Sequence, residues 1–546
     1  MARLIDTRRL TGPNLLLDGP GAGAELELGP DDDVDALIAS IGAVVAREGK
    51  SVGITGPMIV RRAPGWLSLA VAAPVDALLT AADLLEVAAA AVLHVTLADE
   101  VRDLVHTRGR ERDDALVALI DGAAARGTPL MWDDEVVTVG FGARSSTYAR
   151  GALPLPSAVP WATLGAVPTA VITGTNGKTT TTRLLAAILR AAGHAVGATS
   201  TDGVEIDGAV VEAGDWSGPG GARRVLRDAR VTAAALETAR GGLLRRGLAI
   251  TGYGAAVVTN VADDHLGEYG ITDLDAMADV KCLVARGLSA DGVLVVNGAD
   301  PRLRARALTR RGRTALFARE PAGVSDDAWS KTTVVDGAIT IDGRSLIAVA
   351  DVPVCFGGAA TFNVDNALAA AAAAHALGAS DDAIAQGLLR VRPSLAETPG
   401  RANVIDVAGV TVVLDFAHNP AAVAALMTLV HHLASQQGRT GRFIVCMGAP
   451  GDRLDAELTA LADAFADAAP AIVIVRELAD YLRGRAPGAV PDLLSARLHA
   501  RGIGDVRRAA DDVSGLRDAL AVANVGDVVV LTPLIDTEGV TALTAT

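Results

Sequence analysis

The chain has 546 residues, with 49 lysines and arginines against 64 aspartates and glutamates, giving a formal net charge of −15. This length accommodates two to four domains, and a hydrophobic fraction of 50% is typical of globular rather than disordered chains. The acidic balance argues against general binding to nucleic acids or anionic membranes, which needs a basic surface. Arginine carries almost all the positive charge, because lysine occurs only at Lys50, Lys178, Lys281 and Lys331.

The cysteines and the N-terminus favour a reducing compartment. Cys282, Cys355 and Cys446 are scattered and show no CxxC spacing, so they do not form a disulfide framework. The first residues lack the apolar core of a signal peptide. The uncharged run 151–177 could span a bilayer by length, but four prolines interrupt it. We therefore expect a cytoplasmic protein without a membrane partner.

The first part of the chain, residues 1–150, mixes helical and strand patterns. Helical periodicity occurs at 32–48 and 110–127, and a short strand pattern at 135–141. This predicts an N-terminal α/β domain, whose role the sequence does not indicate. Residues 151–166 are rich in proline and are interpreted as a linker.

The remaining chain predicts two further α/β domains. Residues 167–398 repeat a strand, a turn and a helix, and the strands are continuous apolar runs, as a parallel sheet covered on both faces requires. Residues 399–546 form a smaller series of the same kind. The expected fold is therefore three-domain α/β, with a doubly wound parallel sheet in the centre and a smaller Rossmann-like C-terminal domain. The expected strands are 169–173, 195–200, 232–237, 255–260 and 292–297, then 411–415, 442–447, 471–475 and 528–532.

The strongest motif is VITGTNGKTTTTRLL at residues 171–185. A buried strand leads into a glycine-containing turn and then a helix, which directs backbone N–H groups and the positive helix end at an anion. Lys178 would neutralise phosphate charge, and the hydroxyl of Thr179 suits Mg²⁺. Position 172 is isoleucine, whereas the general phosphate-loop pattern has glycine there; an ordinary strand-to-helix turn is the alternative interpretation.

Three further residues could complete a metal site beside this loop. Glu237 ends a predicted strand and His265 follows another, and ligands bind at the carboxyl ends of strands in doubly wound sheets. Lys281 lies on a predicted helix where this chain normally uses arginine. A desolvated lysine can lose its proton, react with CO₂ and become a carbamate ligand. A strand-end cap, a loop histidine and a solvated lysine are the alternative interpretations.

These residues resemble the Mur ligase family, whose members join a carboxylate to an amine through an acyl phosphate. The similarity is greatest to the Mur-ligase-like half of cyanophycin synthetases, and it extends over about residues 165–500. RRLTGPN at residues 8–14 also resembles the start of that family's N-terminal domain. The motifs that carry the main resemblance are TSTDGVEIDG, GDWSGPGGARRVL, LETARGGLLRRGL, VVTNVADDHLGEYGI, PGRANVI, DFAHNPAA, GAPGDR and YLRGR.

The resemblance implies a nucleotide site and a metal site. Lys178, Glu237, His265 and Lys281 would be catalytic, and Thr179, Glu237, His265 and a carbamylated Lys281 would hold one or two Mg²⁺ ions. The residues implied to bind ATP are Gly174, Thr175, Asn176, Gly177, Lys178, Thr179, Thr180, Asn363, Asn366, Arg401 and Asp415.

The resemblance also implies two substrate subsites. One takes a carboxylate acceptor, which could be peptide-like, and the other takes an amino acid or another amine. Surface solvation is the alternative interpretation for the arginines of the second subsite. The residues concerned are Thr201, Asp202, Ser217 and Arg240 for the acceptor, His418 near the nucleotide, and Asp452, Arg453, Arg483 and Arg485 for the amine.

One departure from the family leaves alternatives open. Cyanophycin synthetases carry an ATP-grasp module before the Mur-like part, whereas this sequence reaches the phosphate loop by residue 174. Polymer synthesis and an arginine substrate are therefore in doubt. We expect an ADP-forming ATP-dependent amide ligase. The alternatives are a nucleotide-binding subunit that works with a separate ATP-grasp partner, and a kinase; a homo-oligomer also remains open.

Overall fold

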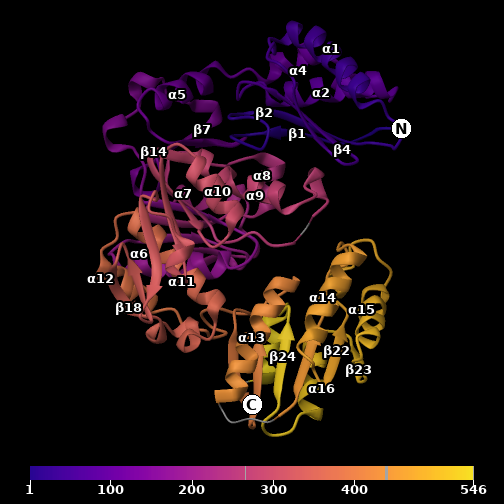
Figure 1. Cartoon of the computed structure of the whole chain (residues 1–546). Coiled ribbons are helices and arrows are strands. Elements are labelled where there is room, and N and C mark those ends of the chain that lie inside the picture. Colours follow the sequence, from indigo (N-terminus) through magenta and orange to yellow (C-terminus); the bar gives the residue numbers. More distant parts are fainter. Residues whose placement is uncertain (265, 437–440, 545–546) are drawn as a thin grey trace.

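The computed structural model describes residues 1–264, 266–436 and 441–544. Figure 1 shows three successive parts of the chain, with the N-terminal segment and the C-terminal segment on opposite sides of the central one. Sequence patterning explains each part, because apolar runs form sheets and helices with one apolar face pack against them. Within the described ranges, no helix combines the length and apolar character needed to cross a bilayer.

The N-terminal part contains two antiparallel sheets. The larger has the strand order β1-β2-β4-β3, with β1 at Arg3–Leu10, β2 at Gly21–Glu27, β3 at Ile59–Ala63 and β4 at Trp66–Ala72. Helices α1 (Val34–Val52) and α2 (Leu78–Leu93) bury their apolar residues against it. The smaller sheet is β5 (Leu130–Trp132), β6 (Val136–Val139) and β7 (Ser146–Ala149), and α5 (Asp114–Ala124) packs against it. Helix α4 (Leu104–Glu111) packs on α1 and α2.

The proline-rich segment after β7 is ordered as a series of short turns. It forms 3₁₀ turns at Arg150–Ala152, Pro156–Ala158 and Trp161–Thr163. Trp161 donates through Nε1 to the carbonyl oxygen of Pro156 at 2.7 Å, and both residues pack against Gly122 of α5. The segment therefore packs along the N-terminal part as it leads into the central sheet.

The central part is built on one eleven-stranded sheet with the order β11-β10-β9-β12-β8-β13-β14-β15-β16-β17-β18. In this order, each strand from β9 through β12, β8, β13, β14 and β15 to β16 pairs in parallel with the next. Antiparallel strands lie at both edges of the sheet. The doubly wound parallel sheet predicted from the apolar runs is confirmed. The parallel strands are β9 (Val196–Thr199), β12 (Ala233–Glu237), β8 (Thr169–Thr173), β13 (Tyr253–Val258), β14 (Leu288–Asn297), β15 (Arg313–Ala318) and β16 (Ser330–Val335).

Helices on both faces and hairpins at both edges complete the central part. Helices α6 (Lys178–Ala191), α11 (Thr361–Ala376) and α12 (Asp381–Leu388) share one core with the sheet. A second core, on the other face of the sheet, contains helices α7 (Pro219–Leu226), α8 (Arg240–Arg246), α9 (Leu274–Cys282) and α10 (Pro301–Thr309). The edge strands are β10 (Gly203–Ile206) and β11 (Ala209–Ala213), then β17 (Ala338–Ile341) and β18 (Arg344–Ala348).

The C-terminal part has a six-stranded sheet with the order β19-β20-β24-β21-β22-β23, in which only β19 runs antiparallel to its neighbour. Helices α13 (Pro420–Gln436), α14 (Asp455–Asp467) and α15 (Ala489–Ala500) cover one face, and α16 (Asp512–Val522) and α17 (Thr537–Thr544) the other. The strands are β19 (Asn403–Val407), β20 (Val410–Leu414), β21 (Phe443–Met447), β22 (Ile472–Arg476), β23 (Val506–Ala509) and β24 (Val528–Thr532).

Candidate functional site

A cavity of about 980 Å³ lies where the three parts meet, at the carboxyl ends of the central strands. This is the place where ligands bind in doubly wound sheets. The N-terminal part contributes Ile5, Asp6, Glu25 and Trp66, which the sequence analysis did not single out. The central part contributes the whole turn from Gly174 to Thr180, and the C-terminal part closes the cavity from the opposite side.

The turn between β8 and α6 forms the floor of the cavity. Gly174 has φ +154° and Gly177 has φ +83°, so both need glycine. A Cβ at Gly177 would come within 2.0 Å of Oδ1 of Asn366. The ammonium of Lys178 donates to the carbonyl oxygen of Thr175 at 3.0 Å, bending over the turn. The N-terminus of α6 and the lysine make this turn suited to phosphate.

Thr179 and Glu237 form a buried pair at the end of β12. The Thr179 hydroxyl donates to Oε2 of Glu237 at 2.8 Å. Glu237 is only 2% exposed, and its Oε1 has no hydrogen-bond partner among the described residues. Burial raises the pKa of Glu237, and Lys178 opposes that shift. A buried carboxylate oxygen without a partner beside a hydroxyl fits a divalent cation that prefers oxygen ligands.

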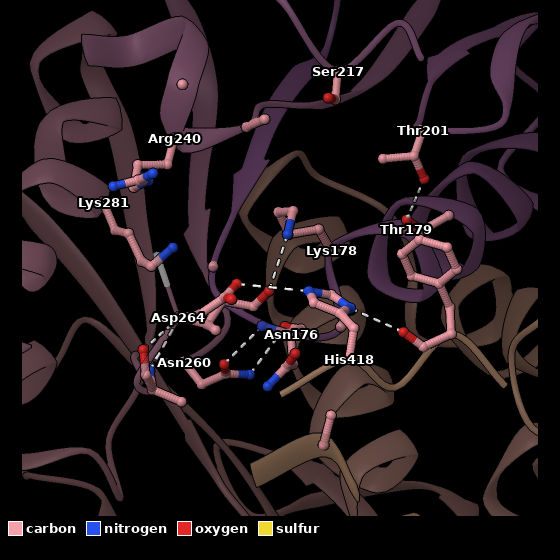
Figure 2. Close-up of a pocket in the computed structure, with 18 of the residues that line it drawn as sticks. Asn176, Lys178, Thr179, Thr201, Ser217, Arg240, Asn260, Asp264, Lys281 and His418 are labelled. Atoms are coloured by element: carbon pink, nitrogen blue, oxygen red, sulfur yellow. Dashed lines mark hydrogen bonds and ion pairs between the residues drawn. The ribbon is translucent and has the colours of Figure 1, made fainter. Parts of the chain in front are cut away.

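Lys281 approaches the same space from α9. It is 3% exposed and lines the cavity, and burial lowers its pKa to about 7, with Lys178 adding repulsion. Figure 2 shows Lys178 and Lys281 directed toward the same opening, on opposite sides of it. His265, the other expected metal ligand, lies outside the described residues. Counting only residues that the structure describes, no three His, Cys, Asp or Glu side chains gather as a metal-binding group.

Asn363 and Asn366 lie on the first turns of α11 and line the cavity beside Phe362. Both are buried. Asn366 donates to Oδ1 of Asn363 at 3.1 Å, and Asn363 donates to the carbonyl oxygen of Val354 at 2.8 Å. These contacts fix the two amides at the edge of the phosphate-binding turn.

Arg401 reaches from the C-terminal part to the start of α6. Its guanidinium donates to the Thr179 hydroxyl at 3.4 Å and to the Thr201 hydroxyl at 3.3 Å, and it lies over the ring of Phe416. Asp415 accepts from the backbone N–H groups of Ala402 at 2.8 Å and Ala417 at 2.7 Å. The guanidinium of Arg401 therefore lies beside the buried pair of Thr179 and Glu237 and approaches it from the C-terminal part.

Two polar contacts join the central and C-terminal parts. Asp264 makes an ion pair with Arg453 at 2.6 Å and lies 3.7 Å from Nε2 of His418. Asn176 and Asn419 exchange side-chain hydrogen bonds at 3.2 and 2.9 Å. The second contact ties the phosphate-binding turn directly to the start of α13.

The residues expected on the acceptor side take different positions. Thr201, Ser217 and Arg240 line the cavity, whereas Asp202 is not among the lining residues and makes ion pairs with Arg183 at 2.8 Å and with Arg401 at 4.0 Å. Ser217 is held by Asp215, to which its hydroxyl donates at 2.6 Å. Figure 2 places Ser217 and Thr201 across the opening from Arg240 and Lys281.

The residues expected at the amine subsite are also divided. Asp452 and Arg483 line the cavity and form an ion pair at 3.0 Å. Arg483 has φ +46°, a strained value for a residue other than glycine. Arg453 lies outside the lining, and Arg485 donates to the carbonyl oxygens of Gly451 and Arg453 and supports their loop.

Sequence reasoning missed two groups of lining or junction residues. Asn260, Asp264 and Asn419 lie inside the motifs that carry the family resemblance, and that resemblance could have marked them. No local signal marked Ile5, Asp6, Glu25 and Trp66, since only the tertiary fold brings the N-terminal sheet to the cavity.

Comparisons with known families match two models along the chain. The Mur ligase middle domain matches residues 172–374, and the glutamate ligase domain of Mur ligases matches residues 400–534. Together these matches contain the phosphate-binding turn, α11 and the C-terminal residues that face them.

Individual relatives agree with these families. The chain is 37% identical to the cyanophycin synthetase of Crocosphaera subtropica over 382 residues, which is 67% of this chain and 42% of that protein. It is 31% identical over 380 residues to the UDP-N-acetylmuramoyl-L-alanyl-D-glutamate–2,6-diaminopimelate ligase of Xanthomonas oryzae pv. oryzae, covering 66% of this chain and 70% of the relative. The chain thus spans about two fifths of the cyanophycin synthetases it matches.

A solved structure shares the fold. E. coli FolC in complex with ADP superposes with a TM-score of 0.50 at 19% identity, over 69% of this chain and 89% of that one. The expected three-part α/β architecture is therefore confirmed at the level of fold.

Proposed function

Because the chain belongs to the Mur ligase family, we propose that it is an ADP-forming amide ligase that couples a carboxylate acceptor to an amino acid or another amine. The observation that carries this proposal is the convergence of the phosphate-binding turn, Glu237, Lys281 and Arg401 on one cavity. A nucleotide-binding site without chemistry would not need a buried carboxylate, a buried lysine and an opposing arginine together.

The nucleotide phosphates are expected to lie over residues 174–180, with Lys178 neutralising their charge. Thr179 and Glu237 would hold a Mg²⁺ ion, and the unpartnered Oε1 of Glu237 supports this assignment. Bound there, the ion supplies electrostatic stabilisation of the transferring phosphoryl group. Asn363 and Asn366 would face the base, and Arg401 and Asp415 the ribose and phosphates.

Lys281 is proposed to carry a carbamate for a second ion, together with His265. The neutral amine attacks the carbon of CO₂ and releases one proton, leaving a negatively charged ligand. Burial of Lys281 in the cavity supports this step, since the shift of its pKa to about 7 makes the neutral amine accessible near physiological pH.

The reaction would proceed in two transfers. The acceptor carboxylate attacks the γ-phosphorus of ATP, and ADP leaves; the amine then attacks the acyl carbon, and phosphate leaves as the amine loses a proton. The chain's contribution is positioning and charge neutralisation. Ser217 and Arg240 lie on the proposed acceptor side, and Asp452 and Arg483 on the amine side. Enclosure by the C-terminal part would keep water from the acyl phosphate.

The deciding experiment is a screen for ADP release from the purified chain. Candidate amino acids are combined with carboxylate acceptors, including aspartyl peptides, and products are identified by mass spectrometry. Amide formation that requires ATP, acceptor and amine together supports the proposal. A phosphorylated product formed without an amine would indicate a kinase instead.

The second candidate is a nucleotide-binding subunit that works with a separate ATP-grasp protein. The phosphate-binding turn in the cavity supports nucleotide binding under this candidate as well. It predicts nucleotide binding without substrate-dependent phosphate release by the single chain.

A further inference from the structure

The loop between β13 and α9 has a strained outer part, residues 266–273. Three of its residues have positive φ: Gly267 at +98°, Tyr269 at +53° and Gly270 at +65°. Tyr269 has a side chain, so its conformation persists only where the surroundings hold it. Glu268 and Tyr269 line the cavity, and the loop leads into α9, which carries Lys281. The shape of this outer loop therefore decides part of the cavity wall.

The N-terminal sheet grips the outer loop through Arg61 on β3. Arg61 donates from one terminal nitrogen to the carbonyl oxygen of Tyr269 at 3.2 Å and from the other to that of Gly270 at 3.0 Å. The planar fork of arginine suits two adjacent carbonyls, whereas lysine offers a single point of attachment. The two bonds fall on Tyr269 and Gly270, two of the three loop residues with positive φ.

Two aromatic contacts reinforce this grip. Trp66 on β4 packs against Gly270 so closely that a Cβ there would lie 2.8 Å from its ring. The guanidinium of Arg8 on β1 lies 4.9 Å from the centre of the Tyr269 ring. Arg8 also bonds Glu25 at 2.5 Å and the carbonyl oxygen of Leu244 at 3.2 Å. These contacts connect the grip to the sheet and to α8.

The sheet is itself anchored, so it can act as a support. The backbone N–H of Thr11 donates to the carbonyl oxygen of Arg246 at 2.9 Å, and that of Leu248 donates to the carbonyl oxygen of Pro13 at 2.8 Å. Arg286 donates to the carbonyl oxygen of Asn14 at 2.6 Å. The segment that follows β1 is thus bonded to the C-terminal end of α8 and to Arg286 of the central part.

We propose that Arg61 is a positioning residue that holds the outer loop in the shape required at the acceptor end of the cavity. Its neighbour Arg62 provides a matched control, because it lies on the same strand but is exposed and pairs with Asp35. The proposal that Arg61 holds the outer loop concerns only the conformation of that loop. Only the kinetic arm of the test below rests on the proposed ligase function.

The first arm measures hydrogen exchange of the backbone in the intact chain. The N–H of Gly267 bonds the carbonyl oxygen of Ile271 at 2.7 Å, and the N–H of Ile271 bonds that of Glu268 at 3.1 Å. In Arg61→Ala these amides should exchange at least about tenfold faster, while Arg62→Ala leaves them unchanged. Equal exchange in both variants overturns the proposal, as does faster exchange spread over all peptides of Arg61→Ala.

The second arm separates the acceptor from the nucleotide. With an aspartyl dipeptide as acceptor, Arg61→Ala should raise the acceptor KM about five- to tenfold, and Arg61→Lys should give a smaller rise. The affinity for AMPPNP with Mg²⁺ should change less than about twofold, because Asn260 bonds the phosphate-binding turn independently of the outer loop. A parallel loss of nucleotide affinity overturns the proposal. Lack of turnover in the unmodified chain contradicts the ligase function alone, since exchange and nucleotide binding still test the grip.

Discussion

Lys178 is the residue whose loss should have the most direct effect on turnover. Lys178→Ala removes the compact charge over the phosphate-binding turn. We expect kcat to fall at least about a hundredfold with every substrate pair, as for other groups that stabilise developing charge. Lys331→Ala is the control, since Lys331 is a surface lysine paired with Asp326. Near-normal ligation by Lys178→Ala contradicts the assignment of the turn.

Lys281 offers a chemical test of the carbamate. Lys281→Ala should abolish most activity, and short-chain carboxylic acids should restore part of it by entering the vacated space as ligands. Lys281→Arg should not be restored, because arginine fills the space and forms no carbamate. The measurement is the rate of ADP release at increasing acid concentration. Unmodified lysine in the intact mass under bicarbonate would count against the modification.

At the scale of elements, the turn between β8 and α6 depends on Gly177. Gly177→Ala adds a Cβ at positive φ within 2.0 Å of Asn366, whose amide is buried and bonded to Asn363. We expect loss of nucleotide binding, measured by calorimetry. Gly193→Ala is the control, because Gly193 has φ +91° with open space around it. That change should cost only about 1–2 kcal/mol of backbone strain and leave nucleotide binding intact.

Helix α2 carries a pH-dependent element away from the site. Burial raises the pKa of Asp83 to about 6, with Glu86 and Glu111 adding repulsion and Thr107 opposing it. The folded state therefore binds more protons than the unfolded state between about pH 4 and pH 6, and stability falls as pH rises through that window.

Asp83→Asn should remove this loss. Its Tm should exceed that of the unmodified chain by a few degrees at pH 7, and the difference should shrink toward pH 4. Asp114→Asn is the control, because Arg112 lowers the pKa of Asp114 and the substitution should bring no gain. A constant difference at all pH values would show that titration is not the cause.

The sequence predicted the elements that contiguous residues encode. The apolar run before Gly174 and the helix after it, the alanine-rich helix and the C-terminal strands lie where the patterns placed them. Strands β1 and β2 of the N-terminal sheet were not expected, and their contribution to the cavity could not be. Contacts such as Arg61 to Gly270 join residues 209 positions apart, and no local pattern reports them.

Sequence patterns also account for which site residues were predicted correctly as lining the cavity. Glu237 and Lys281 were found because strand ends and rare lysines are visible in a sequence. Arg453 was placed at the amine subsite by resemblance, whereas its guanidinium bonds Asp264 across the junction. Its role in the substrate subsite therefore stays a prediction, and its contact across the junction is a property of the tertiary structure.

At the scale of the whole molecule, the ion pair between Asp264 and Arg453 joins the central and C-terminal parts. Arg453→Ala should weaken their contact and admit water to the acyl phosphate. We expect the ratio of phosphate released to amide formed to be severalfold higher in this variant than in the unmodified chain. The ratio of phosphate to product is the measurement, with thermal melting as a check on folding.

Arg497→Ala is the matched control, because Arg497 pairs with Asp463 within the C-terminal part. It should leave the ratio of phosphate to product unchanged. If both variants alter that ratio equally, the junction contact does not govern coupling.

The buried alanines of helix α11 limit which substitutions this chain can accept. Residues Ala369 to Ala374 are at most 1% exposed, between the sheet and α6. A helix of such small side chains lies close to its neighbours, so an added methyl group has no space to enter. Substitution in α11 is therefore limited by volume rather than by chemistry. From Asn366 to Ala374 this helix should tolerate change poorly, including turns that touch no substrate.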